Sequence, residues 1–244
     1  TRFNEAIDQA VAESVADFSK ESELWREVFL GVLGHDLRGP LSVIVMTSEF
    51  MSRMTQDLPF SEHTDRIIRS GQRMSKLLDD LLDYSRATLG MGIRVVRTEG
   101  DLREPLGEEI DLLKAALPSV DIRFDAAGQT RGRFDASRMR EALSNLVTNA
   151  AKYGDADAPI LVALEGSEDD VTVVVRNKGA SLSSDALAAL FDPLKRGPRA
   201  AMSGEQASLG LGLFIVREIV RAHGGDVIAR SSADTTSFTM RMPR

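Results

Sequence analysis

The chain has no cysteine in its 244 residues, which excludes disulfide bonds and thiolate metal sites. It has no run of about 18 apolar residues and no signal-peptide pattern, so we expect no membrane contact by this segment and a cytoplasmic location. Positive charge is not in excess either, since the formal net charge is −7. We therefore expect no direct binding to nucleic acid, which requires a basic patch that neutralises phosphates.

Hydrophobic residues make up 43% of the sequence, enough to form packed cores, and 244 residues give room for one large domain or two small ones. The first residue is Thr1 rather than Met, so we expect a piece of a longer protein from which an input domain is missing. Gly90 and Gly92 separate a long helical pattern from a mixture of short strands and helices. We predict domains at 25–90 and 91–244, preceded by a helical linker at 1–24.

One histidine stands in an unusual helical context between Phe29 and Ile44. Leucines at 30, 33, 37 and 41, followed by residues 44, 48 and 51, recur at spacings of three and four and predict one continuous stripe. His35 projects nearly opposite that stripe, so we expect it to face solvent, where a second protein or domain can meet it. The alternative is an ordinary surface histidine. Against it, Pro40 and three nearby glycines weaken the helix around His35, which indicates a segment that bends.

The helical part of the chain predicts a dimer. Residues 1–24 give a polar helix with a thin apolar seam, typical of a coiled coil or of a frayed terminus. We expect the first helix to stop near Pro59 and a second, from Glu62 to Leu89, to pack against it as an antiparallel hairpin. Each helix carries more apolar surface than one hairpin can bury, so we predict a four-helix bundle formed by a homodimer.

The second domain alternates short strands with helices, which predicts an α+β fold with layered helices and sheet. The predicted strands are Ile93 to Arg97, Asp121 to Phe124, Gly132 to Phe134, Ile160 to Glu165, Val171 to Arg176, Asp226 to Arg230 and Ser237 to Met242. The predicted helices are Leu102 to Leu117, Ser137 to Tyr153, Ser183 to Leu190 and Leu211 to His223. Consecutive strands at Ile160 and Val171 favour antiparallel hairpins over a doubly wound parallel sheet.

Two stretches of this domain carry chemistry. Asn145 and Asn149 lie four residues apart on one helix face, with Lys152 three further on. Asparagine is a poor helix former, whereas its amide oxygen suits Mg²⁺ and hydroxyl groups; plain polar surface positions are the alternative. Gly210 and Gly212 precede an amphipathic helix whose first amides are free to bind phosphate, although no Walker or Rossmann fingerprint is present.

These strings resemble those of sensor histidine kinases of two-component systems. His35, Asp36, Leu37, Arg38 and Pro40 match the phosphoacceptor box of that family. The strings NLVTNAAKY, VRNKGAS, LFDPLKRG and SLGLGL follow in the order of its nucleotide-binding boxes, which are shared with Hsp90- and gyrase-type ATPases. The resemblance implies a helical-hairpin domain followed by a two-layer α/β sandwich that binds ATP.

The resemblance also assigns roles. It implies that His35 and Asp36 are catalytic and that Asn149 ligates Mg²⁺. It implies nucleotide contacts by Asn145, Asn149, Lys152, Tyr153, Asn177, Gly179, Phe191, Gly210, Leu211 and Gly212. The segment from Asp192 to Leu209 corresponds to a mobile lid over ATP.

The implied activity is ATP-dependent autophosphorylation of His35 and phosphoryl transfer to an aspartate of a response-regulator receiver. Three departures from the family pattern, Asn177 in place of aspartate, Ser181 and Ser208, support an alternative: a non-catalytic dimeric scaffold that signals by conformation alone. An amide can accept from adenine, but a flipped amide suits guanine equally well. On sequence alone we therefore expect Asn177→Asp to raise the preference for ATP over GTP, because a carboxylate can only accept.

Overall fold

The computed structural model describes residues 39–48, 50–51, 61–194 and 209–244. By internal packing the chain divides into two units, Thr1–Leu77 and Leu78–Arg244. The predicted linker at 1–24, the predicted catalytic pair His35 and Asp36, and most of the predicted lid lie outside the described residues. No helix in the described ranges is long and apolar enough to cross a membrane.

The first unit contains a helical segment at residues 39–48 and 50–51 and most of α2, Ser61–Thr88, close to the predicted Glu62 to Leu89. The buried Ser70 hydroxyl donates to the Pro40 carbonyl at 2.6 Å, which ties the two helical segments together. The predicted stripe residue Leu41 is 51% exposed in the single chain, and Val45 on the next turn is 46% exposed. This uncovered apolar surface is what a four-helix bundle of two chains would bury.

The second unit is built on a five-stranded sheet in the order β2-β4-β5-β7-β6. The strands are β2 Ile122–Gly128, β4 Ile160–Gly166, β5 Asp170–Lys178, β6 Asp226–Ser232 and β7 Thr235–Pro243. The predicted hairpin of β4 with β5 is confirmed as antiparallel, and β5 with β7 and β6 with β7 are antiparallel too. The exception is β2, which runs parallel to β4.

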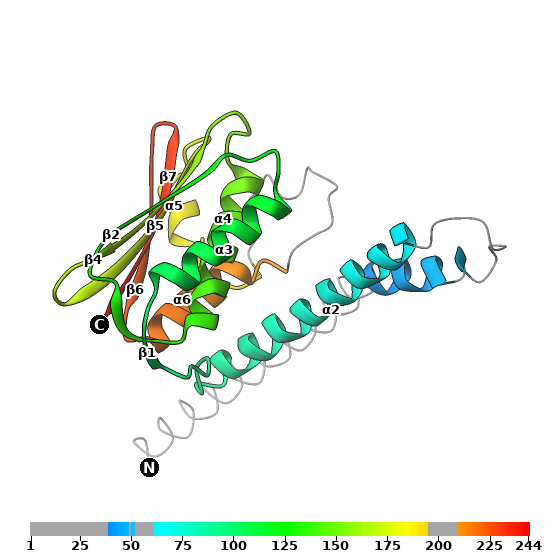
Figure 1. The fold of residues 1–244 in the computed structure, drawn as a ribbon, viewed down its shortest axis with the longest axis horizontal. Coiled ribbons are helices and arrows are strands. Elements are labelled where there is room, and N and C mark those ends of the chain that lie inside the picture. Colours follow the sequence, from blue (N-terminus) through cyan, green and yellow to red (C-terminus); the bar gives the residue numbers. More distant parts are fainter. Residues whose placement is uncertain (1–38, 49, 52–60, 195–208) are drawn as a thin grey trace, which may run out of the picture. The chain divides into compact units, whose positions relative to one another are not determined.

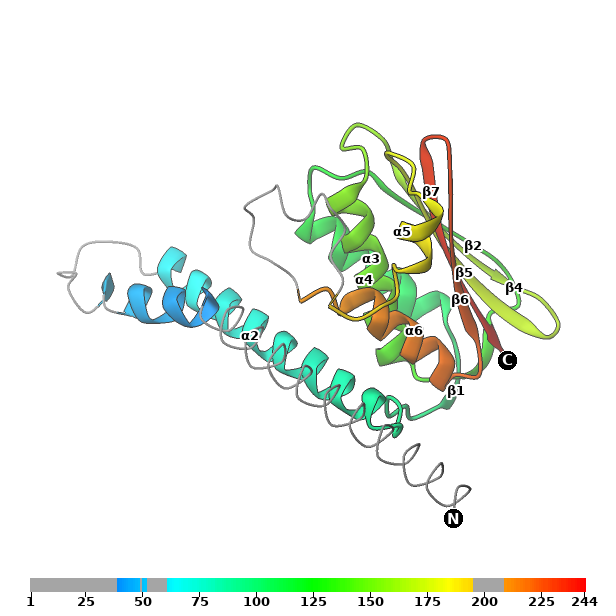
Figure 2. The same ribbon diagram turned by 180° about the vertical axis from the view of Figure 1, so that it is seen from behind.

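Helices cover one face of this sheet, as Figures 1 and 2 show from opposite sides. They are α3 Arg103–Ala116, α4 Ala136–Tyr153, α5 Ser184–Ala188 and α6 Gly212–Ala222. Strand β5 shows why helices cover this face: Val171, Val173 and Val175 are fully buried and alternate with less buried residues. The predicted two-layer architecture is confirmed.

The predicted strand from Ile93 to Arg97 is wrong. A short strand, β1 Thr98–Asp101, begins just after it and pairs antiparallel with β3 Arg131–Phe134. The backbone N–H of Val96 donates instead to the Asp135 carboxylate at 2.8 Å, so this segment is held by a side chain rather than by a strand ladder. The buried side chain of Ile93 supplied the apolar signal that suggested a strand.

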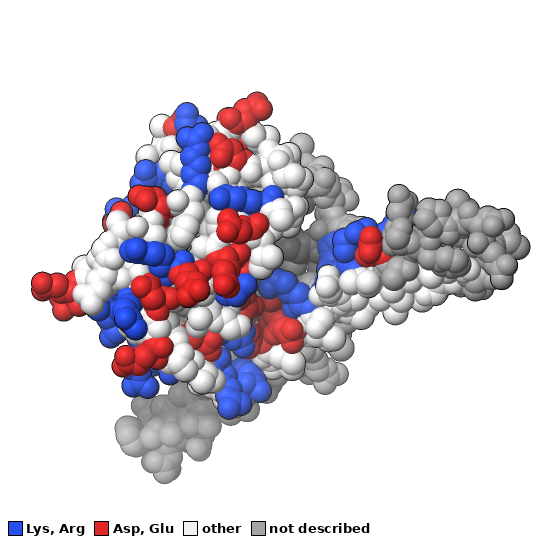
Figure 3. Space-filling model, in the orientation of Figure 1, with Lys and Arg blue, Asp and Glu red and all other residues white. Residues whose placement is uncertain are grey.

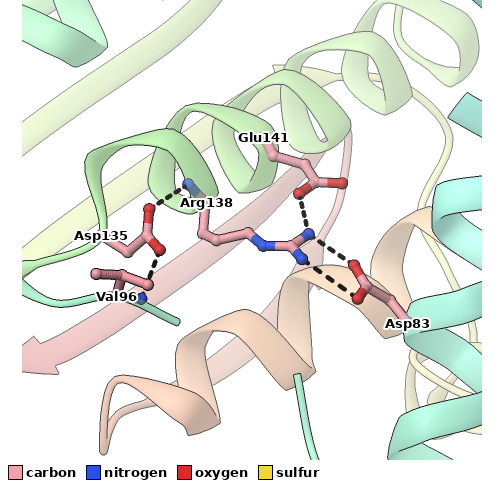
Figure 4. A network of polar contacts seen from close by, with 5 residues as sticks. All are labelled: Asp83, Val96, Asp135, Arg138 and Glu141. Carbon is pink, nitrogen blue, oxygen red and sulfur yellow. Dashed lines mark hydrogen bonds and ion pairs between the residues drawn. The ribbon is translucent and has the colours of Figure 1, made fainter. Parts of the chain in front are cut away.

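Charged side chains of both signs are interspersed over the second unit on the face seen in Figure 3. One network, drawn in Figure 4, is partly buried. Arg138 of α4 pairs with Asp83 near the end of α2 at 2.6 Å and with Glu141 at 2.8 Å. Its side chain is 25% exposed and that of Asp83 is 8% exposed. Tyr84, the residue after Asp83, meets the ring of Phe214 edge-on at 5.5 Å, and burial raises the pKa of Tyr84 to about 12.

We expect Asp83→Asn to lower the free energy of unfolding by about 1 to 2 kcal/mol, since it leaves part of the Arg138 charge without a counter-ion in a shielded place. The remaining Glu141 contact and the partial exposure of Arg138 keep the loss below that of a fully buried pair. Asp79→Asn, at an exposed position of the same helix, is the control. Denaturant unfolding of both variants is the measurement, and equal effects would contradict a specific role for the pair.

His223 follows α6 and is 1% exposed. Its Nδ1–H donates to the Ile219 carbonyl at 2.8 Å, and its Nε2 accepts from the backbone N–H of Asp135 at 3.0 Å. Both ring nitrogens are therefore used by the neutral imidazole. Burial lowers the pKa of His223, which favours the neutral form in the folded state.

This lowered pKa predicts a pH dependence. The unfolded chain binds a proton on His223 near pH 6.5 and the folded chain binds it only at lower pH, so stability falls as pH drops through that window. His223→Gln keeps one acceptor and one donor but does not titrate. We expect its free energy of unfolding to change less than that of the wild type between about pH 7 and 5. Parallel curves for the two proteins would show that His223 is not the titrating group.

Candidate nucleotide-binding site

Helix α4 carries the predicted asparagines on the face that the core leaves free. Its opposite side is enclosed, with Met139, Ala142, Leu143, Leu146, Val147 and Ala150 all at most 2% exposed. The helix begins at Ala136 because the Asp135 carboxylate accepts from the backbone N–H of Arg138 at 3.1 Å. Asn145 and Asn149 are half-buried on that remaining face, and Lys152 is exposed near its end.

Asn145 lies against the start of α6. A Cβ at Gly212 would stand in ordinary contact with the Asn145 Oδ1, at 3.5 Å, so the start of α6 lies directly beside this side chain. The Asn145 Nδ2 is buried and has no hydrogen-bond partner. An unsatisfied buried donor costs about 1 to 3 kcal/mol, which a ligand rich in acceptors, such as a polyphosphate, would offset.

The first turn of α6 is a second source of free donors. No side chain caps it at Leu211, and the preceding Gly210 has φ +70°, a conformation that favours glycine. The first N–H groups of such a helix attract anions. Leu211 is itself 1% exposed, so the predicted contact of this residue with nucleotide is restricted to its backbone.

The predicted base-reading residue lies at the other end of α4. Asn177 follows Val171, Val173 and Val175 on the enclosed face of β5 and is 7% exposed. Its Nδ2 donates to the Lys178 carbonyl at 2.9 Å. A polar residue at the end of an otherwise apolar strand face is suited to contact a flat heterocycle with both polar edges and an apolar surface.

Three of the other predicted residues, Gly179, Tyr153 and Lys152, lie near Asn177. A Cβ at Gly179 would lie 3.2 Å from the Tyr153 carbonyl and 3.5 Å from the Asn177 Nδ2, so Gly179 and Tyr153 join Asn177. The Lys152 ammonium is 5.4 Å from the centre of the Tyr153 ring. Phe191, at the base of the predicted lid, meets Phe238 of β7 edge-on at 6.4 Å.

Two residues near Asn177, Thr236 and Gly154, were not predicted from the sequence. Thr236 of β7 is the cross-strand neighbour of Asn177 and is 7% exposed. Its hydroxyl oxygen lies 3.3 Å from that of Ser231. The alternation of buried and less buried residues along β7 could have indicated Thr236, but β7 starts two residues before the predicted strand. Gly154 ends α4, and the tyrosine-glycine pair after the asparagine string was the available sign.

A divalent cation fits this site only with help from the nucleotide. Within the part of the chain that the structure describes, no three His, Asp or Glu side chains come close enough together to hold a metal ion. One amide oxygen plus phosphate and water oxygens is a common Mg²⁺ environment, and the half-buried Asn149 has the amide required.

Gly154 has no room for a side chain. A Cβ there would lie 2.4 Å from the Ala150 carbonyl and 3.0 Å from the Asn177 Nδ2. We expect Gly154→Ala to displace Asn177, to cost about 1 to 3 kcal/mol of stability and to weaken nucleotide binding. Gly107→Ala on α3 is the matched control, because its Cβ would make an ordinary 3.7 Å contact with Phe124. Calorimetric titration with ATP on both variants is the test, and equal affinities would remove Gly154 from the site.

Two family models match the sequence. The His Kinase A (phospho-acceptor) domain matches residues 25–90. The family described as histidine kinase-, DNA gyrase B- and HSP90-like ATPase matches residues 134–244, which include α4, the end of β5 and α6. The second match implies ATP binding. Together the two matches cover more than half of the chain.

Similar proteins agree with these matches. A bacteriophytochrome of Pseudomonas aeruginosa is 31% identical over 97% of this chain and 33% of its own length. The signal transduction histidine-protein kinase AfsQ2 of Streptomyces coelicolor is 27% identical over 99% of this chain and 46% of its own length. The chain thus spans a third to about half of these relatives.

Among solved structures, the histidine kinase ThkA in complex with the response regulator protein TrrA superimposes with a TM-score of 0.58 and 23% identity. The superposition covers 93% of this chain and 66% of that one, and at this identity it supports the fold. With a phosphoacceptor domain and an ATP-binding domain in this order, the chain belongs to the sensor histidine kinases of two-component systems.

Proposed function

We propose that the protein is an ATP-dependent protein-histidine kinase that phosphorylates His35 and passes the phosphoryl group to an aspartate of a response regulator. The observation that carries this proposal is the pairing of α4 with the start of α6, where Asn145, whose Nδ2 is buried without a hydrogen-bond partner, lies beside Gly212. Donors of this kind suit the phosphates of a nucleotide. The same chain contains the histidine box to which a γ-phosphoryl group could be transferred.

In the proposed reaction, Asp36 holds the His35 imidazole through Nδ1–H and takes up the proton. Nε2 then attacks the γ-phosphorus, a P–N bond forms, and the bond to the leaving ADP oxygen breaks. Mg²⁺, held by the Asn149 amide oxygen, would offset charge on the phosphates. In the neutral imidazole with Nδ1 protonated, Nε2 keeps its lone pair and can act as the nucleophile.

We propose two partners, a second copy of this chain and a response-regulator receiver domain. The uncovered apolar surface of the helical hairpin supports a homodimer. The related ThkA has been solved with a response regulator, which supports a receiver domain as the phosphoryl acceptor here. A cytoplasmic location, where ATP is available, and an N-terminal sensor domain outside this chain complete the proposal.

The competing function is a dimeric scaffold that does not turn ATP over. Its support is Asn177, Ser181 and Ser208 at positions where the family usually has aspartate or glycine. Incubation with γ-labelled ATP and Mg²⁺ separates the two functions. We expect acid-labile, base-stable label on the wild type and none on His35→Gln. ATP binding without any label on the wild type would favour the scaffold.

Asn149→Asp tests the metal-binding assignment. The change is nearly isosteric, but it adds negative charge beside the nucleotide phosphates, so we expect autophosphorylation to fall by at least about tenfold with fold and dimer intact. Thr148→Asp adds the same charge at the neighbouring exposed position and is the control. The initial rate of label incorporation is the measurement. Wild-type turnover in Asn149→Asp would remove Asn149 from the site.

Gly39→Asn tests the direction of the reaction. The family resemblance implies that threonine or asparagine at this position orients the water that hydrolyses a phosphorylated receiver, and glycine has no side chain to do so. Gly39 is exposed and a Cβ there would meet nothing within 4 Å, so an asparagine can be accommodated. We expect the wild type to be a weak phosphatase and the variant a stronger one.

The measurement for Gly39→Asn is the decay of a phosphorylated receiver with and without ADP. Label incorporation into His35 should stay level or fall, because the substitution also removes about 0.3 kcal/mol of helix weakening from a segment that the sequence predicts to bend. Strong acceleration of decay by the wild type, with no gain in the variant, would contradict this account.

A further inference from the structure

The side-chain amide of Asn177 has two chemically different ends, and only one of them is held by the protein. Its Nδ2 donates to the Lys178 carbonyl at 2.9 Å. Its Oδ1 accepts no hydrogen bond within the described residues and is not among the enclosed, unpartnered side-chain atoms. The nitrogen is therefore engaged inside the fold, while the oxygen is left for a ligand.

The surroundings of the nitrogen are made of carbonyl oxygens. A Cβ at Gly154 would lie within 3.0 Å of the Asn177 Nδ2, 3.1 Å of the Lys178 carbonyl and 2.4 Å of the Ala150 carbonyl, so these atoms converge on one point. The Lys178 carbonyl also accepts from the Asp155 backbone N–H at 2.8 Å, which fixes its position. An amide turned by 180° would place Oδ1 against the Lys178 carbonyl oxygen, where two acceptors face each other.

We infer that the Lys178 carbonyl locks the Asn177 amide, so that Asn177 presents only an acceptor to the nucleotide base. The inference rests on the proposed ATP-binding function and names the specificity of that site. Adenine offers a donor, its exocyclic amine, to such an oxygen, whereas guanine offers the acceptor O6 at the corresponding position. Asn177 then discriminates as a carboxylate would, although a freely turning amide would not.

The locked amide reverses the expectation from sequence for Asn177→Asp. Aspartate would keep the oxygen that faces the base, but its second oxygen would replace the Nδ2 donor among carbonyl oxygens at a position that is 7% exposed. The substitution gains no new contact with adenine and loses the bond to Lys178. Restoring the residue that the family usually has at this position weakens ATP binding in this protein.

The test is calorimetric titration of ATP, GTP and inosine triphosphate into the wild-type chain. Inosine triphosphate carries the O6 acceptor of guanine but no exocyclic amine. We expect ATP to bind at least about tenfold more tightly than either competitor, the scale of one well-placed hydrogen bond. GTP or inosine triphosphate within about threefold of ATP overturns the locked amide. Failure of all three to bind overturns the proposed function and this inference with it.

Asn177→Asp is the second arm, with circular dichroism and thermal unfolding to establish that it folds. We expect about a tenfold loss in ATP affinity at pH 7.5, with partial recovery toward pH 5.5, where a protonated carboxyl regains a donor for the Lys178 carbonyl. Higher ATP affinity in the variant, or greater selectivity than in the wild type, overturns the inference. Ser232→Asp, which adds the same negative charge at an exposed position four residues before Thr236, is the charge-matched control.

Discussion

The burial of α4 between the sheet and the neighbouring helices is the constraint on which the nucleotide site depends. Six of its side chains are at most 2% exposed, so the helix cannot rotate without opening the core. That fixed rotation holds Asn145 and Asn149 on the opposite face. The same helix is fixed at both ends: Asp135 caps its first turn, and Gly154 allows Asn177 to approach its last carbonyls. Stability and ligand placement therefore come from the same contacts.

The helices that carry the candidate site, α4 and α6, also contact the end of α2. Arg138 is two turns before Asn145 on α4, and its partner Asp83 belongs to α2. Phe214 is two residues after Gly212 on α6, and it packs on Tyr84 of α2. A change in the position of the last turns of α2 would act on both helices at once. One ionic contact and one aromatic contact thus connect α2 to the elements proposed to hold the phosphates.

Most helices and strands, and the segments that carry the candidate site, could be predicted from sequence because each depends on local spacing. The helix from Ser137 to Tyr153 was predicted within one residue of α4, since its apolar period is regular. The parallel pairing of β2 with β4 was not foreseen, because it joins segments separated by a helix. The orientation of the Asn177 amide depends on the Lys178 carbonyl and on Gly154, and no local pattern encodes it. The position of His35 remains a prediction, since it lies outside the described residues.

The central claim is that ATP lies along α4, between the start of α6 and the end of β5. Backbone hydrogen exchange with and without a non-hydrolysable Mg·ATP analogue tests it most directly. The account predicts slower exchange for the free amides at Gly212, Leu213 and Phe214, because bound nucleotide occupies those donors. It also predicts slower exchange for the segment from Asn177 to Gly179, because a nucleotide bound there opposes local opening of the end of β5. Protection confined to another part of the second unit, such as the arginine-lined pocket at Arg97 and Arg133, would contradict it.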